Sequence, residues 1–213
     1  MKTCCKHRGR PKTLDDTVQR EAIIAVARML FLQKGYGATT TEDIVGHCRI
    51  SKQTLYRLFP GKAALFAAVV EQGRQQWLNL PVPDDMPLEM ALEAVFRLDI
   101  GEDEERARLQ QMQMTLAEAQ LYPELREIIK SCGSAQAHAL LAAWLQSRAE
   151  RGELKLAGDA LTTARLLTDM VFGALLRRAI GDLEWRSGEA WRVHVRIAIG
   201  VFLRGVEARN TGQ

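Results

Sequence analysis

The 213-residue chain has little of what several classes of protein need. It holds six prolines and four cysteines, and no stretch approaches the ~18 uninterrupted apolar residues of a membrane span. Cys4 and Cys5 are adjacent while Cys48 and Cys132 are isolated, so they form no disulfide framework and fit a reducing compartment. The basic N-terminus is followed by no apolar core, so it is not a secretory signal. We therefore expect a soluble, cytoplasmic protein without membrane contact.

Sequence motifs for catalysis are also missing. The chain has no H-E-x-x-H, no Glu-x-x-His pair, no G-x-S-x-G and no phosphate-cradling glycine loop. Cys4, Cys5 and His7 lack the usual zinc spacing and a fourth ligand, so a tail without metal is favoured over a metal site. We expect no enzyme activity, no cofactor and no metal.

Charge is distributed unevenly along the chain. The net charge is only +3, but residues 1–62 hold twelve Lys and Arg against five Asp and Glu. Residues 63–213 hold seventeen against twenty-one. A basic N-terminal third on an acidic remainder indicates a head that binds a polyanion.

Apolar residues recur with helical spacing along nearly the whole chain. Ile23, Ala27 and Leu30 fall on one helix face, and Gly35 stands at a usual stop position. Strand-like alternation is absent, so the sequence predicts an all-α fold. The nine expected helices span 14–34, 40–48, 52–58, 62–79, 88–98, 103–120, 123–151, 159–181 and 188–208, with a proline-rich linker at 80–87.

The last two long helices are unusually apolar. On 189–208 the polar residues occupy one narrow stripe, whereas a helix on a single core needs an apolar stripe of only ~100° or a little more. Burial on two sides is therefore predicted, in a four-helix bundle made by two subunits, with burial inside one subunit as the alternative. The expected interface residues are Leu167, Val171, Leu175, Ile197, Val201 and Phe202.

Residues 40–59 predict two short helices joined by a tight turn. This is the helix-turn-helix arrangement, whose second helix enters the major groove of DNA. The outer face of 52–58 offers donors, acceptors and an aromatic ring, which suit base edges and phosphates. These residues are Lys52, Gln53, Thr54, Tyr56 and Arg57.

The same segment resembles the TetR/AcrR-type bacterial transcriptional regulators. The matching stretches are Phe31-Leu-Gln-Lys-Gly35-Tyr36, then Thr40-Thr41-Glu-Asp-Ile-Val45, then Ser51-Lys-Gln-Thr54-Leu55-Tyr56-Arg-Leu-Phe59-Pro-Gly-Lys62-Ala-Ala-Leu65. Where the family usually has Ala-Gly, this chain has Cys48-Arg49. A left-handed backbone there would cost a non-glycine residue of order 1 kcal/mol.

The resemblance implies three parts and a role for each. Residues 1–13 would be a basic flexible arm, 14–62 the DNA-binding domain, and 63–213 a helical domain for ligand binding and dimerisation. The protein would be a homodimeric repressor, released from a palindromic operator on double-stranded DNA by an unknown small-molecule inducer. A small-molecule carrier bundle with an incidental basic head is the alternative. The implied DNA contacts are Thr40, Thr41, Arg49, Lys52, Gln53, Thr54, Tyr56, Arg57 and Lys62.

Three further expectations concern single segments. Arg8-Gly9-Arg10-Pro11 resembles the core of an AT-hook, in which Arg8 and Arg10 would enter the minor groove of DNA. The alternative is a solvated basic tail. Cys48 is read as a small buried hydrophobe rather than an oxidation switch. The acidic body disfavours a highly anionic ligand. Candidate pocket residues, for each of which a place in the hydrophobic core is the default interpretation, are Trp77, Phe96, Met112, Met114, Trp144, Met170 and Phe172.

Overall fold

The computed structural model describes residues 15–156, 158–179 and 188–206, and this part of the chain is all helical. α7, η1 and α8 form one continuous rod, because the backbone at their junctions keeps right-handed helical angles. The described ranges thus contain nine helical rods, as predicted. The elements are α1 (Asp16–Ala38), α2 (Thr41–Cys48), α3 (Lys52–Leu58), α4 (Lys62–Trp77), α5 (Leu88–Val95), α6 (Glu102–Leu121), α7 (Pro123–Ile128), the π-helical η1 (Ile129–Ser134), α8 (Ala135–Glu150), α9 (Ala160–Ala179) and α10 (Gly188–Val206).

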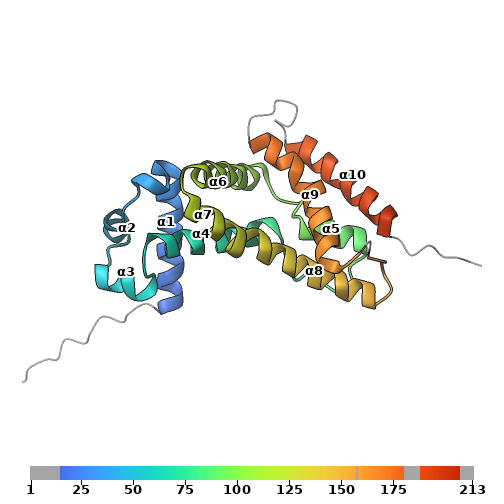
Figure 1. The fold of residues 1–213 in the computed structure, drawn as a ribbon, viewed down its shortest axis with the longest axis horizontal. Helices are drawn as coiled ribbons and strands as arrows, with labels where there is room; N and C mark the ends of the chain where they lie inside the picture. Colours follow the sequence, from blue (N-terminus) through green and yellow to red (C-terminus); the bar gives the residue numbers. More distant parts are fainter. Residues whose placement is uncertain (1–14, 157, 180–187, 207–213) are drawn as a thin grey trace, which may run out of the picture.

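The helices form an elongated molecule with two hydrophobic cores. Figure 1 shows α1–α3 at one end and α9 and α10 at the other, with α4 and the α6–α8 segment between them. α4 belongs to both cores: Leu65 and Phe66 are buried with α1–α3, whereas Trp77 packs against the second core. Leu125 of α7 also enters the first core. The helix that leaves the N-terminal module is therefore continuous with the body.

The outer helices correct part of the predicted dimer interface. Leu167, Val171 and Phe202 are buried in the core of the same subunit, so their assignment to an interface with a partner is wrong. Ile197 and Val201 instead remain exposed, by 61% and 47%. The reason is that the inward face of α10 packs on α5 and α9, which leaves a second apolar face outside. The side chain of Leu175 lies outside the described residues.

Two searches of the described residues return nothing. No helix in these ranges is both long enough and apolar enough to cross a membrane. Over the same ranges, no three metal-ligating side chains come together. Cys4, Cys5, His7, Arg8 and Arg10 lie outside the described residues.

Candidate nucleic-acid interface

Local capping interactions fix the ends of the two short helices. Thr40 caps α2: its hydroxyl accepts a hydrogen bond from the Asp43 N–H at 3.1 Å, and the Asp43 carboxylate accepts one from the Thr40 N–H at 3.0 Å. Ser51 caps α3 by accepting from the Thr54 N–H at 3.0 Å. Each cap joins residues that are only three positions apart in the sequence.

The turn between the helices contains a left-handed residue. Arg49 has φ 53° and ψ 43°, and it ends α2 at the position where the resembling family usually has glycine. Such a conformation costs a non-glycine residue about 1 kcal/mol. Gly35 also has a positive φ, of 80°, and interrupts α1 at the predicted stop, although a helical turn resumes as far as Ala38.

α3 presents Gln53 and Tyr56 to solvent. Leu55 and Phe59 point into the first core, so the opposite face of the helix is outside. Tyr56 is 50% exposed, and its hydroxyl lies 3.4 Å from the Thr41 hydroxyl, which joins α3 to the start of α2. Gln53 is exposed and makes no side-chain hydrogen bond within the described part of the chain. An exposed amide and an exposed phenol offer hydrogen-bonding groups that can read the edges of bases.

Two basic residues of α3 that are expected to contact DNA already have partners within the subunit. Arg57 donates two hydrogen bonds to the Asp16 carboxylate, at 2.6 and 2.9 Å, and Lys52 pairs with Glu42. These hydrogen bonds lower the pKa of Asp16 and Glu42 below their ordinary values. Both pairs are exposed, so exchanging a carboxylate for a phosphate costs little.

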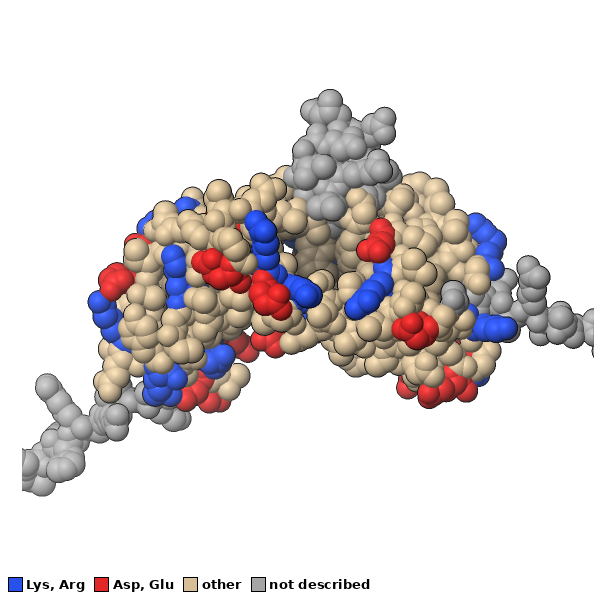
Figure 2. Space-filling model, viewed as in Figure 1, with Lys and Arg blue, Asp and Glu red and all other residues tan. Residues whose placement is uncertain are grey.

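Charge at this end of the molecule is therefore mixed. Residues 15–62 hold seven Lys and Arg against five Asp and Glu. Figure 2 shows basic and acidic side chains interspersed over the visible face of this end. The strong positive excess of the N-terminal third lies mainly in its first twelve residues, beyond the described part.

Lys62 has a structural contact that its sequence position did not indicate. Its ammonium donates to the Tyr36 carbonyl at 2.8 Å and lies 4.2 Å from the centre of the Tyr36 ring. Lys62 therefore ties the start of α4 to the corner between α1 and α2. Arg20 has a similar role, because it donates to the Leu58 carbonyl at the end of α3 and stacks on Phe59 at 4.4 Å. Sequence alone carries no signal for Arg20, whose partner lies 38 residues away.

The same corner is held by α6. The buried Tyr36 N–H donates to the Glu118 carboxylate at 2.8 Å, and the Tyr36 ring packs edge-on against Tyr122 at 5.4 Å. A Cβ at Gly37 would lie 1.9 Å from the Tyr122 hydroxyl, so only glycine permits this approach. Glu118 and Tyr122 therefore attach the N-terminal helical module to the rest of the protein next to α2.

A cavity of about 260 Å³ lies along the middle of α6. Three of the predicted pocket residues line it: Trp77, Met112 and Phe172. The other four candidates are not among the residues that line this cavity. Phe96 and Trp144 are buried in the second core, Met114 packs against the first core, and Met170 offers its carbonyl to His194.

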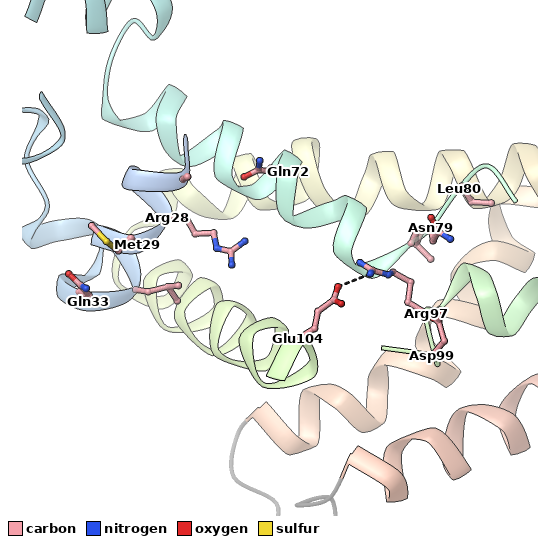
Figure 3. A pocket seen from close by; sticks show the side chains of 12 residues that line it. Arg28, Met29, Gln33, Gln72, Asn79, Leu80, Arg97, Asp99 and Glu104 are labelled. Atoms are coloured by element: carbon pink, nitrogen blue, oxygen red, sulfur yellow. Dashed lines mark ion pairs between the residues drawn. The ribbon is translucent and has the colours of Figure 1, made fainter. Parts of the chain in front are cut away.

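A larger cleft, of about 1070 Å³, lies between α1 and the turn that leads into α6. Figure 3 shows Arg28 on one side of it and Arg97 on the other, with an Arg97–Glu104 ion pair of 2.6 Å. Its walls are polar and carry both signs of charge, whereas pockets for small organic ligands are mostly apolar. The smaller, more apolar cavity is therefore the better candidate for a ligand site.

Asp43 makes the helix-turn-helix sensitive to acid. The Thr40 backbone N–H, helped by Lys34, lowers the pKa of Asp43 from 3.8 to about 2. A depressed pKa in the folded state means that the carboxylate stabilises the fold above pH 4 and stops doing so as the pH falls toward 2. Urea unfolding should show Asp43→Asn less stable than wild type at pH 7, with the difference shrinking below pH 4 and disappearing as the pH falls through 2. A difference independent of pH would contradict this assignment.

Comparisons with known proteins agree with this geometry. The family model "Bacterial regulatory proteins, tetR family" matches residues 23–69, and "AefR-like transcriptional repressor, C-terminal domain" matches 98–205. The regulator UidR of Escherichia coli K12 is 25% identical over 177 residues, which cover 79% of this chain and 88% of UidR. Matches to two other curated bacterial regulators cover only 25% and 30% of those proteins.

Solved structures share the whole fold. A TetR-family regulator from Mesorhizobium loti superimposes with a TM-score of 0.68 at 23% identity, covering 92% of this chain and all of that one. The flavonoid-responsive regulator FrrA gives 0.66 at 26% identity, covering 91% and 99%. The fold and site are those of a helix-turn-helix DNA-binding regulator rather than an enzyme. The chain belongs to the TetR family of transcriptional regulators and has an AefR-like C-terminal domain.

Proposed function

We propose that the protein is a homodimeric repressor in the bacterial cytoplasm, where DNA is accessible, and that a small molecule releases it from a palindromic operator. The observation that supports this best is the outward face of α3, where Gln53 and Tyr56 are exposed beside the capped start of α2. The repressor-type C-terminal domain supports the direction of regulation. FrrA, which is named as flavonoid-responsive, supports control by a small ligand.

An exposed apolar stripe on α10 supports dimerisation. Val193, Ile197 and Val201 are spaced four residues apart, so they lie on one face of the helix, and all three are exposed. A twofold partner presenting the same stripe would cover it. The two α3 helices would then enter successive major grooves, about one helical turn or 34–36 Å apart.

α6 supports a route from the cavity to the DNA-binding module. Gln111, Met112, Thr115 and Leu116 line the cavity, and Glu118 follows on the same helix with its carboxylate on the Tyr36 N–H. A ligand that shifts this part of α6 would move the corner before α2. The separation of the two α3 helices in a dimer would change with it.

Operator binding tests the proposal. Wild-type protein should bind a palindrome from the DNA upstream of its own gene, with an affinity that falls steeply with salt. Gln53→Ala should lose about 1–3 kcal/mol of discrimination against altered bases while keeping its affinity for random duplex. Tyr56→Ala should weaken operator binding.

Fluorescence anisotropy at two salt concentrations provides the measurement. Gln110→Ala, at an exposed position on α6, is the matched control and should bind as wild type does. Equal losses on every sequence for Gln53→Ala would argue against base reading by α3. Affinity that does not change with salt would instead indicate a carrier bundle.

A further inference from the structure

The wall of the cavity along α6 contains a positively charged side chain but no carboxylate among the described residues. Its wall includes the apolar side chains of Trp77, Met112 and Phe172, together with two ionisable residues, Arg74 and His138. No aspartate or glutamate is among the described lining residues. A site that is mostly apolar and has a cationic group without a carboxylate favours an anionic ligand over a cationic one.

His138 adds no charge to this wall. Burial, followed by the nearby Arg165, lowers its pKa below the ordinary value of 6.5, against a smaller opposing effect of Asp169. Its Nε2 lies 3.0 Å from the Thr168 hydroxyl, so the ring is held as a neutral hydrogen-bonding group. Arg74 is therefore the one charged side chain at neutral pH among the described residues of the wall.

Two polar atoms of the wall are buried without a partner. The Arg74 Nε–H makes no hydrogen bond, and neither does the Oε1 of Gln111, a residue only 4% exposed. A buried polar group that lacks a partner costs about 1–3 kcal/mol. Gln111 lies against the neighbouring residue Gly73, since a Cβ at Gly73 would be 2.3 Å from its Nε2. Its amide can present either a donor or an acceptor to a bound molecule.

A buried arginine without any hydrogen-bond partner is stacked on Trp77, which lines the cavity. Arg108 is 2% exposed, and all three nitrogens of its guanidinium lack a hydrogen-bond partner. The group is stacked 4.5 Å from the ring centre of Trp77 and 5.6 Å from that of Trp191. Burial lowers the pKa of Arg108 to about 10, so it remains a cation at neutral pH.

The acidic neighbours of Arg108 are already paired with other arginines. Glu104 pairs with Arg97 at 2.6 Å, and Glu105 pairs with Arg192 at 3.0 Å. Arg192 also pairs with Glu189 at 3.5 Å, so this cluster has three guanidinium groups and three carboxylates among the described residues. Arg108 is nevertheless left without a hydrogen-bonded carboxylate of its own, and a buried cation of this kind is costly.

We propose that the cavity binds a flat aromatic molecule with one carboxylate. This inference rests on the proposed function, in which the cavity is the inducer site. The carboxylate accepts hydrogen bonds from Arg74 and the Gln111 amide, and the aromatic body lies among Trp77, Met112 and Phe172. A single negative charge complements Arg74 in a wall without carboxylates, and this is compatible with the acidic body, which disfavours a highly anionic ligand.

Matched pairs of probes test the charge directly on the full-length wild-type protein. Isothermal titration calorimetry would compare 2-naphthoate with 2-naphthamide, and benzoate with benzamide, which have the same rings without the charge. In at least one pair, the carboxylate should bind about tenfold more tightly or better. Equal or tighter binding of the amides, or no binding of either carboxylate, would overturn the proposal.

Variants then locate the charge. Arg74→Met should remove the preference for the carboxylate, and Arg74→Lys should retain part of it. Arg106→Gln, which removes an exposed cation from α6, should bind both probes as wild type does. An unchanged preference in Arg74→Met, with a native thermal midpoint, would contradict the assignment.

Operator binding by the same samples separates this inference from the proposed function. Protein that binds its operator but shows no preference for carboxylates overturns the ligand class alone. Protein that prefers carboxylates but binds no operator overturns the repressor function while the chemistry of the cavity stands.

Discussion

Ile197→Glu should convert the protein to a folded monomer and weaken operator binding by on the order of 10²- to 10⁴-fold. Ile197 is 61% exposed at the centre of the apolar stripe, between Val193 and Val201. In a twofold interface the Glu side chain of each subunit would be buried opposite the same Glu side chain of the partner. This is unfavourable because each carboxylate loses its hydration and because the two negative charges repel each other. The loss of affinity follows because two linked half-site contacts become independent.

Sedimentation velocity and circular dichroism measure the two parts of this result. Met90→Glu, an equally exposed apolar position on α5, is the matched control and should remain a dimer. Phe202→Glu should unfold the subunit instead, because Phe202 is buried in the core. An intact Ile197→Glu dimer would place the interface elsewhere.

Glu118→Ala should release the corner between α1 and α2 from the body. The Tyr36 N–H is buried and donates to this carboxylate, so removing it leaves a donor without a partner at a cost of about 1–3 kcal/mol. We expect a lower thermal midpoint and faster hydrogen exchange at the Tyr36 amide. Operator affinity should fall too, because α2 and α3 lose the contact that orients them.

Glu118→Gln separates this hydrogen bond from a general packing defect. Its amide oxygen keeps an acceptor at the same place, so exchange at Tyr36 should remain slow. Tyr36 protection that is equal in Glu118→Ala and wild type would show that the contact does not hold the corner.

Features set by neighbouring residues could be predicted from the sequence. The caps at Thr40 and Ser51, the break at Gly35 and the left-handed turn at Arg49 each depend on atoms within a few positions along the chain. The spacing of 40–59 likewise indicated a helix-turn-helix, because its small core is formed by residues close in sequence. Helix periodicity also indicated the all-α fold.

Only the tertiary structure decided which charged and apolar groups are left without partners. Arg57 meets Asp16 across 41 residues, and Tyr36 meets Glu118 across 82. Helical periodicity shows that a helix has an apolar face but not which helix covers it, so buried Leu167 and exposed Ile197 looked alike. The sequence thus determined the elements and the DNA-binding motif. The fold determined the buried cation of α6, Arg108, and the uncovered stripe of α10, because burial depends on packing between distant segments.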